Sequence, residues 1–250
     1  IFSNGFANTI VIFTSDNGPS IESYLPKEFV PNHPTFFASY GPFDGIKRDC
    51  WEGGLRMPNI AWWPGKINEG KIINTPSMLS DWLPTFAGAA HIPAPARVNG
   101  VSLLPSLTGN GKQKTSMVYV EYFENGNTPD FKEFNPSHRG RQRNQMQMVR
   151  MDSLAGVRYD IKSADDDFEI YNVVTDPDES DNLGRIPAYQ YLQNAMKAKV
   201  LQVRRSSQEA PRPYDSALIP AVPFQKKMKH GWNWKFFEGD FPWVIEPDAL

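Results

Sequence analysis

Residues 8–19 read NTIVIFTSDNGP, a short apolar run that ends in an acid, an amide, a glycine and a proline. Turn residues bound the run on both sides, which predicts a strand over residues 8–15 that is buried on both faces of an α/β sheet. In such sheets ligands gather beyond the carboxyl ends of the strands, where Asp16 and Asn17 lie. The same residue types also end strands without any ligand. The pair is therefore either a plain turn or a site for a hard divalent cation.

Composition excludes several classes of function. The chain has 250 residues, of which 40% are hydrophobic and 22% charged, as is ordinary for a globular protein. A formal net charge of -2 gives no electrostatic footprint for nucleic acid. No apolar segment approaches the roughly 20 residues needed to cross a bilayer, so we expect no membrane span. The single cysteine, Cys50, excludes an internal disulfide framework.

The first half of the chain continues with a second strand and a helix. The apolar patch NIAWWPGKI, residues 59–67, predicts a short strand that ends at Pro64. Residues 76–90 have apolar side chains at helical spacing, with Pro84 as a kink or a restart of the helix. Proline, glycine and asparagine at close intervals over residues 94–111 indicate a run of turns that leaves this domain.

Beyond residue 115 the pattern becomes that of a small antiparallel sheet followed by a helix. The segments MVYVEYF, QMQMVRM, LAGVRYDI and FEIYNVV are separated by turn residues and predict four strands. Pro187 then opens a segment with one apolar face, which predicts a helix that ends near residue 205. The stretch from residue 206 is rich in proline and aromatic residues, and we interpret it as an extended arm.

Four pieces of the sequence, taken in order, resemble the type I sulfatases of the alkaline phosphatase superfamily. The pieces are NTIVIFTSDNGP, YGPFDGIKRDCWEGGLRMPNIAWWPGKI, SMLSDWLPTFAGAA and VRYDIKSADDDFEIYNVVTDPDESDNLG, and they span residues 8–184. The resemblance implies that Asp16 and Asn17 bind the divalent cation of the active site, Ca²⁺ with Mg²⁺ as the alternative. It also implies that Lys47 faces the sulfate group of the substrate.

The resemblance also implies an architecture. Residues 1–112 are expected to form the C-terminal part of the sulfatase catalytic α/β domain, the remainder of an alkaline-phosphatase-like mixed or parallel sheet. Residues 113–205 are expected to form a small α+β C-terminal subdomain with an antiparallel sheet and a helix. Residues 206–250 remain the aromatic and proline-rich arm.

The chemistry of sulfate esters explains these residue types. Negative charge that develops on the sulfate oxygens has to be met by fixed positive charge, which a divalent cation and a lysine supply. Asp16 would contribute charge to the cation and Asn17 a neutral oxygen, whereas Lys47 would contribute a compact point charge to the anion. The alternative for Lys47 is an ordinary solvated loop lysine.

Other polar residues carry less weight. Residues 44–58, DGIKRDCWEGGLRMP, form a glycine-rich turn that also contains Lys47. Glu52 and Arg56 lie in this turn, where a salt bridge that fixes the loop is favoured over substrate contact. Cys50 does not fit the C-x-P-x-R or C-x-A-x-R setting of the sulfatase nucleophile, and a buried free thiol is the better interpretation. His33 and His138 fall in irregular loops and are candidate substrate contacts.

The first half of the sulfatase pattern is not present in this sequence. The formylglycine nucleophile, two further acidic ligands of the cation, and additional lysine and histidine contacts belong to that half. We therefore expect the N-terminal half of the same enzyme, or a companion chain, as a partner, and we expect this chain alone to be inactive. The family resemblance implies that the substrate is a sulfated small molecule or glycan. It also implies that the compartment is periplasmic, secreted or lysosome-like.

Two other functions remain open at this point. One is a phosphoryl or phosphonate ester hydrolase of the same superfamily, because a cation and a lysine would also serve a phosphate. The other is a non-catalytic module that binds a sugar or another partner through its loops and aromatic arm.

Overall fold

The computed structural model describes residues 8–21, 33–204, 209 and 211–215, together with two short strands, β7 (Val222–Pro223) and β8 (Lys235–Phe236). The N-terminal region holds a two-stranded antiparallel sheet of β1 (Val11–Thr14) and β2 (Asn59–Trp62), in which Val11 lies opposite Trp62. Between them in the chain lies α1 (Glu52–Leu55), a single helical turn.

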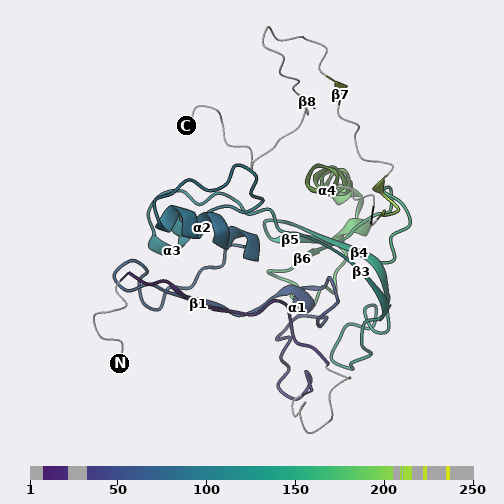
Figure 1. Ribbon diagram of the computed structural model, residues 1–250. Helices are drawn as coiled ribbons and strands as arrows, with labels where there is room; N and C mark the ends of the chain where they lie inside the picture. The colour runs from purple at the N-terminus through teal and green to yellow at the C-terminus, as the bar shows by residue number, and fades with distance from the viewer. Residues whose placement is uncertain are drawn as a thin grey trace.

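Two helices cover one face of this small sheet (Figure 1). A short 3₁₀ helix, η3 (Leu79–Asp81), leads directly into α2 (Trp82–Ala89), and α3 (Leu104–Thr108) follows. The helices contribute buried side chains that pack against half-buried residues of both strands: Trp82, Leu103 and Leu107 against Ile12, Ala61 and Ile67. Pro84 lies in the first turn of α2, where a backbone N–H is not needed, so the predicted restart of the helix is confirmed.

The C-terminal region is a four-stranded antiparallel sheet in the order β3-β4-β5-β6. Its strands are β3 (Tyr119–Asn127), β4 (Gln142–Met151), β5 (Leu154–Arg158) and β6 (Glu169–Asn172). Two short 3₁₀ helices, η4 (Leu183–Arg185) and η5 (Pro187–Tyr189), lead into α4 (Gln190–Val203). The four predicted strands and the predicted helix are confirmed.

The four-stranded sheet lies between α4 on one face and the glycine-rich turn that contains α1 on the other (Figure 1). Alternate residues of β4 point to opposite faces, as the period of a strand requires. Val149 packs with Leu192 and Met196 of α4. Met146 packs in the cluster that contains Cys50 and Trp51 from the turn. The turn was assigned to the first domain from the sequence, yet it is part of the core of the second.

Three expectations need correction. The first strand is not buried on both faces, since Val11 and Phe13 are 46% and 63% exposed and β1 pairs only with β2 among the described residues. The segment 94–111 is not only turns, because it contains α3, a helix too short for its period to be recognised. The glycine-rich turn contains α1, which was also not predicted. Most of the predicted arm, residues 206–250, lies outside the described residues.

No helix within the described residues has both the length and the apolar character needed to cross a bilayer.

Candidate functional site

The loop that follows β1 carries the predicted cation ligands and packs against the turn that carries Lys47. The backbone N–H of Lys47 donates a hydrogen bond to the carbonyl oxygen of Pro19 at 2.7 Å, and that of Gly18 donates to Gly54 at 2.9 Å. Both segments therefore meet through their backbones at two points. The structure brings Asp16, Asn17 and Lys47 together, although they lie about 30 residues apart in the sequence.

Asp16 has the properties of a charged ligand. Its side chain is exposed, and its pKa is lowered. The first cause is a hydrogen bond from its own backbone N–H; burial opposes it, and the Asn17 amide, Ser15 and the positive charge of Lys47 add to the lowering. The influence of Lys47 on this carboxylate indicates that the two charges lie near each other.

Asn17 has an unused oxygen. Its Oδ1 atom is buried and has no hydrogen-bond partner among the described residues. A buried polar atom without a partner is costly, and such an atom in a native structure calls for an explanation. An amide oxygen beside an exposed carboxylate matches the donor set of a hard divalent cation, so the two residues fit one. No group of three or more His, Cys, Asp or Glu side chains within the described residues has the arrangement of a complete metal site.

Glycines let the two segments approach this closely. A Cβ atom placed on Gly18 would lie 2.0 Å from the carbonyl oxygen of Gly53, far inside van der Waals contact. A Cβ atom on Gly53 would lie 2.6 Å from the carbonyl oxygens of Asp44 and Gly45. Both positions require glycine because no space is left for a Cβ atom.

Buried carboxylates hold the glycine-rich turn in place, and the sequence did not reveal most of them. Asp49 accepts hydrogen bonds from the backbone N–H of Ile46 at 3.0 Å, from Thr128 at 2.7 Å and from Arg143 at 2.8 and 3.1 Å. Glu52 forms ion pairs with Arg56, as predicted, and with Arg150 on β4 at 2.9 Å. The acidic residues in DGIKRDCWEGG were the available signal, but their partners lie about 100 residues away.

The two histidine candidates lie in different environments. His33 is exposed, its Nδ1 lies 3.0 Å from the Thr35 hydroxyl, and its ring packs edge-on against Phe131. His138 has no exposed surface; its Nδ1 lies 2.7 Å from Asp44 and its ring stacks on Trp51 at 3.9 Å. His138 is therefore enclosed by protein side chains, which does not favour the expected substrate contact, and that role stays a prediction. Its ring instead packs beside the turn.

One other sequence interpretation agrees with the structure. Cys50 is a buried free thiol, and burial raises the pKa of that thiol well above its ordinary value.

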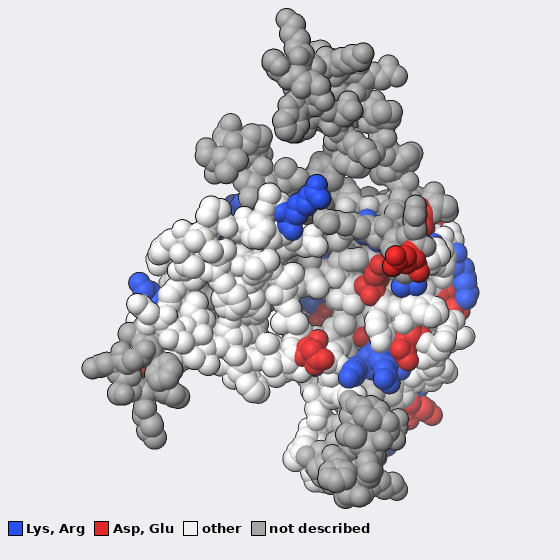
Figure 2. Space-filling view, viewed as in Figure 1, with Lys and Arg blue, Asp and Glu red and all other residues white. Residues whose placement is uncertain are grey.

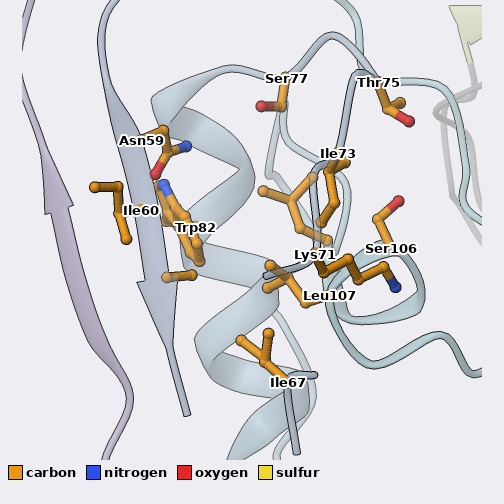
Figure 3. Close-up of a pocket in the computed structure, with 12 residues that line it drawn as sticks. Asn59, Ile60, Ile67, Lys71, Ile73, Thr75, Ser77, Trp82, Ser106 and Leu107 are labelled. Atoms are coloured by element: carbon orange, nitrogen blue, oxygen red, sulfur yellow. The ribbon is translucent and has the colours of Figure 1, made fainter. Parts of the chain in front are cut away.

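A separate cavity of about 270 Å³ lies between β2, α2 and α3 (Figure 3). Ile60 of β2, Trp82 of α2 and Leu107 of α3 line it together with the side chain of Lys71. Neither Asp16, Asn17 nor Lys47 is among its lining residues. This cavity is therefore distinct from the candidate cation site.

Comparison with known proteins assigns the family. The model of the family described as N-sulphoglucosamine sulphohydrolase, C-terminal, matches residues 38–206, more than half of the chain. The chain belongs to this family of sulfatase C-terminal regions. The match begins before Lys47 and extends through α4.

Related sequences are sulfatases that are much longer than the aligned region. The steryl-sulfatase of Mus musculus is 35% identical over 116 residues, which are 46% of this chain and 18% of that protein. The N-acetylgalactosamine-6-sulfatase of Homo sapiens is 35% identical over 102 residues, or 40% of this chain and 18% of that protein. The chain thus spans less than a fifth of the length of the curated relatives that it matches.

Solved structures agree on the fold. Ps i-CgsB superposes with a TM-score of 0.59 at 18% identity, over 85% of this chain and 40% of that one. A 2-O GAG sulfatase superposes with a TM-score of 0.52 at 21% identity, over 87% of this chain and 41% of that one. The chain therefore shares the fold of the regions that it covers in these two structures.

Proposed function

We propose that this chain is the C-terminal part of a divalent-cation-dependent sulfatase that acts on sulfated carbohydrate. The observation that carries the proposal is the meeting of Asp16 and Asn17 with the turn that carries Lys47, in a chain of a sulfatase family. A plain turn explains Asp16 and Asn17 less well, because it leaves the buried Oδ1 atom of Asn17 without a partner.

Asp16 and Asn17 would hold the cation, Ca²⁺ or in its place Mg²⁺, through one charged and one neutral oxygen. The bound cation would supply positive charge that polarises the sulfate group. Lys47 would add a second positive charge on the anion, where negative charge increases in the transition state. The hydrogen bonds of the turn fix its backbone before a substrate arrives, so little reorganisation is needed during the reaction.

The proposed substrate class rests on the names of the family and of its relatives. The family description names N-sulphoglucosamine, and several relatives are N-acetylgalactosamine-6-sulfatases. Both names refer to amino sugars that carry sulfate.

The remaining parts of the active site would come from an N-terminal portion of the same enzyme or from a companion chain. That portion would supply the formylglycine nucleophile and further acidic ligands of the cation. It would also cover apolar side chains on β1 and β2, where Phe13 and Ile60 are 63% and 61% exposed. The surface over α2, α3 and β1 carries few charged side chains (Figure 2), as expected of a covered face. A periplasmic, secreted or lysosome-like compartment fits this proposal.

The experiment is an activity assay on the complete enzyme that contains this chain. Its hydrolysis of a sulfated amino sugar and of an aryl sulfate is measured with Ca²⁺ and with a chelator, beside matched phosphate and phosphonate esters. The proposal predicts cation-dependent release of sulfate that exceeds release from the phosphorus esters. Faster hydrolysis of a phosphate or phosphonate ester would favour the alternative hydrolase.

A further inference from the structure

The segment DPDESDNL, residues 176–183, is exposed or half-buried except at one position, Glu179, which lies in the interior of the protein. The side chain of Glu179 has no exposed area. Its Oε2 atom accepts a hydrogen bond from the backbone N–H of Glu52 at 2.9 Å, across 127 positions of the sequence. One acidic side chain from the C-terminal subdomain thus holds the first residue of α1.

Hydrogen bonds within the segment fix the backbone on both sides of Glu179. The carboxylate of Asp176 accepts hydrogen bonds from the backbone N–H of Ser180 at 3.0 Å, from the hydroxyl of Ser180 at 2.7 Å and from the backbone N–H of Asp181 at 2.9 Å. Glu179 itself adopts the left-handed conformation with a φ angle of 56°. That conformation is uncommon for residues other than glycine and costs energy that the surrounding contacts have to offset.

The turn held by Glu179 is the one that contacts the candidate site. Glu52 is followed by Gly53 and Gly54, and the carbonyl oxygen of Gly54 accepts the hydrogen bond of Gly18 at 2.9 Å. Gly18 follows Asn17 directly, and its contact with the turn leaves no room for a Cβ atom. A displacement of the turn therefore displaces the loop that carries the cation ligands.

We propose that Glu179 is a positioning residue of the active site, which fixes the turn at residues 51–54 and, through it, Asp16, Asn17 and Lys47. Glu179 touches neither substrate nor cation in this arrangement. The inference rests on the proposed function, because its effect is expressed as cation binding and sulfate hydrolysis. Supporting groups around a metal site are commonly worth 10–100-fold in affinity, about the effect expected here.

The surroundings of Glu179 allow a matched pair of variants. Burial and the neighbouring acids Glu52, Asp44 and Asp176 raise the pKa of Glu179 well above its ordinary value. A raised pKa favours the neutral carboxyl group, and an amide of the same shape can accept the same hydrogen bond through its oxygen atom. Glu179→Gln keeps the proposed contact, whereas Glu179→Ala removes it.

The experiment measures Ca²⁺ affinity by calorimetry, the melting temperature, and kcat and KM for a sulfate ester, on the complete enzyme. Glu121→Ala is the matched control, because Glu121 is also a hydrogen-bonded acid of the C-terminal subdomain, with partners Tyr119, Tyr214 and Arg204. We expect Glu179→Ala to weaken Ca²⁺ binding about 10–100-fold and to lower kcat. We expect Glu179→Gln to keep wild-type affinity, and Glu121→Ala to lower the melting temperature without changing Ca²⁺ affinity.

Wild-type Ca²⁺ affinity in Glu179→Ala, or an equal loss in Glu121→Ala, would overturn the proposal. If Glu179→Ala does not fold, Glu179→Asp replaces it, because its shorter side chain cannot reach Glu52 from the same backbone position; wild-type affinity in that variant would also overturn it. A wild-type enzyme that binds Ca²⁺ but hydrolyses no sulfate ester would refute the proposed function, while the order of Ca²⁺ affinities would still decide the role of Glu179. A wild-type enzyme that binds neither Ca²⁺ nor Mg²⁺ overturns both.

Discussion

At the scale of single residues, Asn17 offers a test that separates binding from folding. Its Oδ1 atom has no hydrogen-bond partner among the described residues, so Asn17→Ala removes little that stabilises the protein without a cation. A bound cation stabilises the folded state in proportion to its affinity. We expect Asn17→Ala to melt near the wild-type temperature with a chelator and to lose most of the rise in melting temperature that Ca²⁺ causes.

The measurement is thermal unfolding of the complete enzyme over a Ca²⁺ titration. Asp165→Ala is the control, because Asp165 is an exposed acid in a different loop. A full Ca²⁺-dependent rise in Asn17→Ala would exclude Asn17 as a ligand.

The raised pKa of Glu179 predicts that the stability of the protein depends on pH. Its pKa in the folded protein is raised above the ordinary value of 4.5, chiefly by burial. A raised pKa means that the stabilising contribution is complete below about pH 4.5 and is lost as the pH rises through the folded pKa. Glu179→Gln has no group to ionise. The wild type should therefore lose stability relative to Glu179→Gln as the pH rises above 4.5. The difference between their free energies of unfolding should grow by up to about 1.4 kcal/mol per pH unit.

Denaturant unfolding of both proteins at several pH values measures this difference. Parallel profiles for the wild type and Glu179→Gln would contradict a raised pKa at this position.

At the scale of elements, the contact between the loop after β1 and the turn that contains α1 depends on Gly18. We expect Gly18→Ala to cost about 1–3 kcal/mol of stability, because its Cβ atom would overlap the carbonyl oxygen of Gly53. Since the loop has to move to relieve the overlap, Ca²⁺ affinity should fall as well. Gly65→Asn is a suitable control: Gly65 has a φ angle of 70°, which asparagine tolerates, and no atom within 4 Å of the Cβ position.

Chemical denaturation and calorimetry together test this prediction. A Gly18→Ala variant with wild-type stability and wild-type Ca²⁺ affinity would mean that the loop and the turn are not rigidly coupled.

Local sequence patterns predicted most of the strands and helices of the C-terminal region. Alternation of apolar residues predicted the four strands of the C-terminal sheet, and the apolar face of residues 187–205 predicted α4. The helix α3 was missed because five residues are fewer than two helical turns. The placement of β1 as a strand was correct, but its burial was not, because burial depends on what packs against a strand.

In the candidate site too, some features could be predicted from the sequence and others could not. The order of the sequence pieces led to Asp16, Asn17 and Lys47, and the structure brings them together, while their roles stay predictions. The contacts of Asp49 with Arg143 and of Glu52 with Glu179 span 94 and 127 positions. No local periodicity carries that information, so the support of the turn could not be predicted. The burial of His138 could not be predicted for the same reason, since it comes from contacts with Trp51 and Asp44.

At the scale of the whole molecule, the exposed apolar surface predicts association. Val11 and Phe13 on β1, Ile60 on β2, and Leu83 and Phe86 on α2 are between 46% and 63% exposed. Such a surface favours contact with another protein segment or with a second copy. We expect residues 1–250 expressed alone to self-associate and to bind a hydrophobic dye, and the complete enzyme to do neither.

Light scattering with size-exclusion chromatography tests this expectation. A monodisperse, cooperatively melting monomer of residues 1–250 would contradict the proposal that an N-terminal portion covers this face.

In the proposed active site, Lys47 and the cation ligands act on one sulfate group. The most direct measurement is sulfate release by the complete enzyme, compared between the wild type, Lys47→Ala and the control Lys66→Ala, which removes an exposed lysine outside the turn. We expect a loss of about 10²–10³-fold in kcat for Lys47→Ala on both an aryl sulfate and a sulfated sugar, with an unchanged melting temperature, and wild-type activity in the control. Wild-type kcat in Lys47→Ala on both substrates would contradict this proposal.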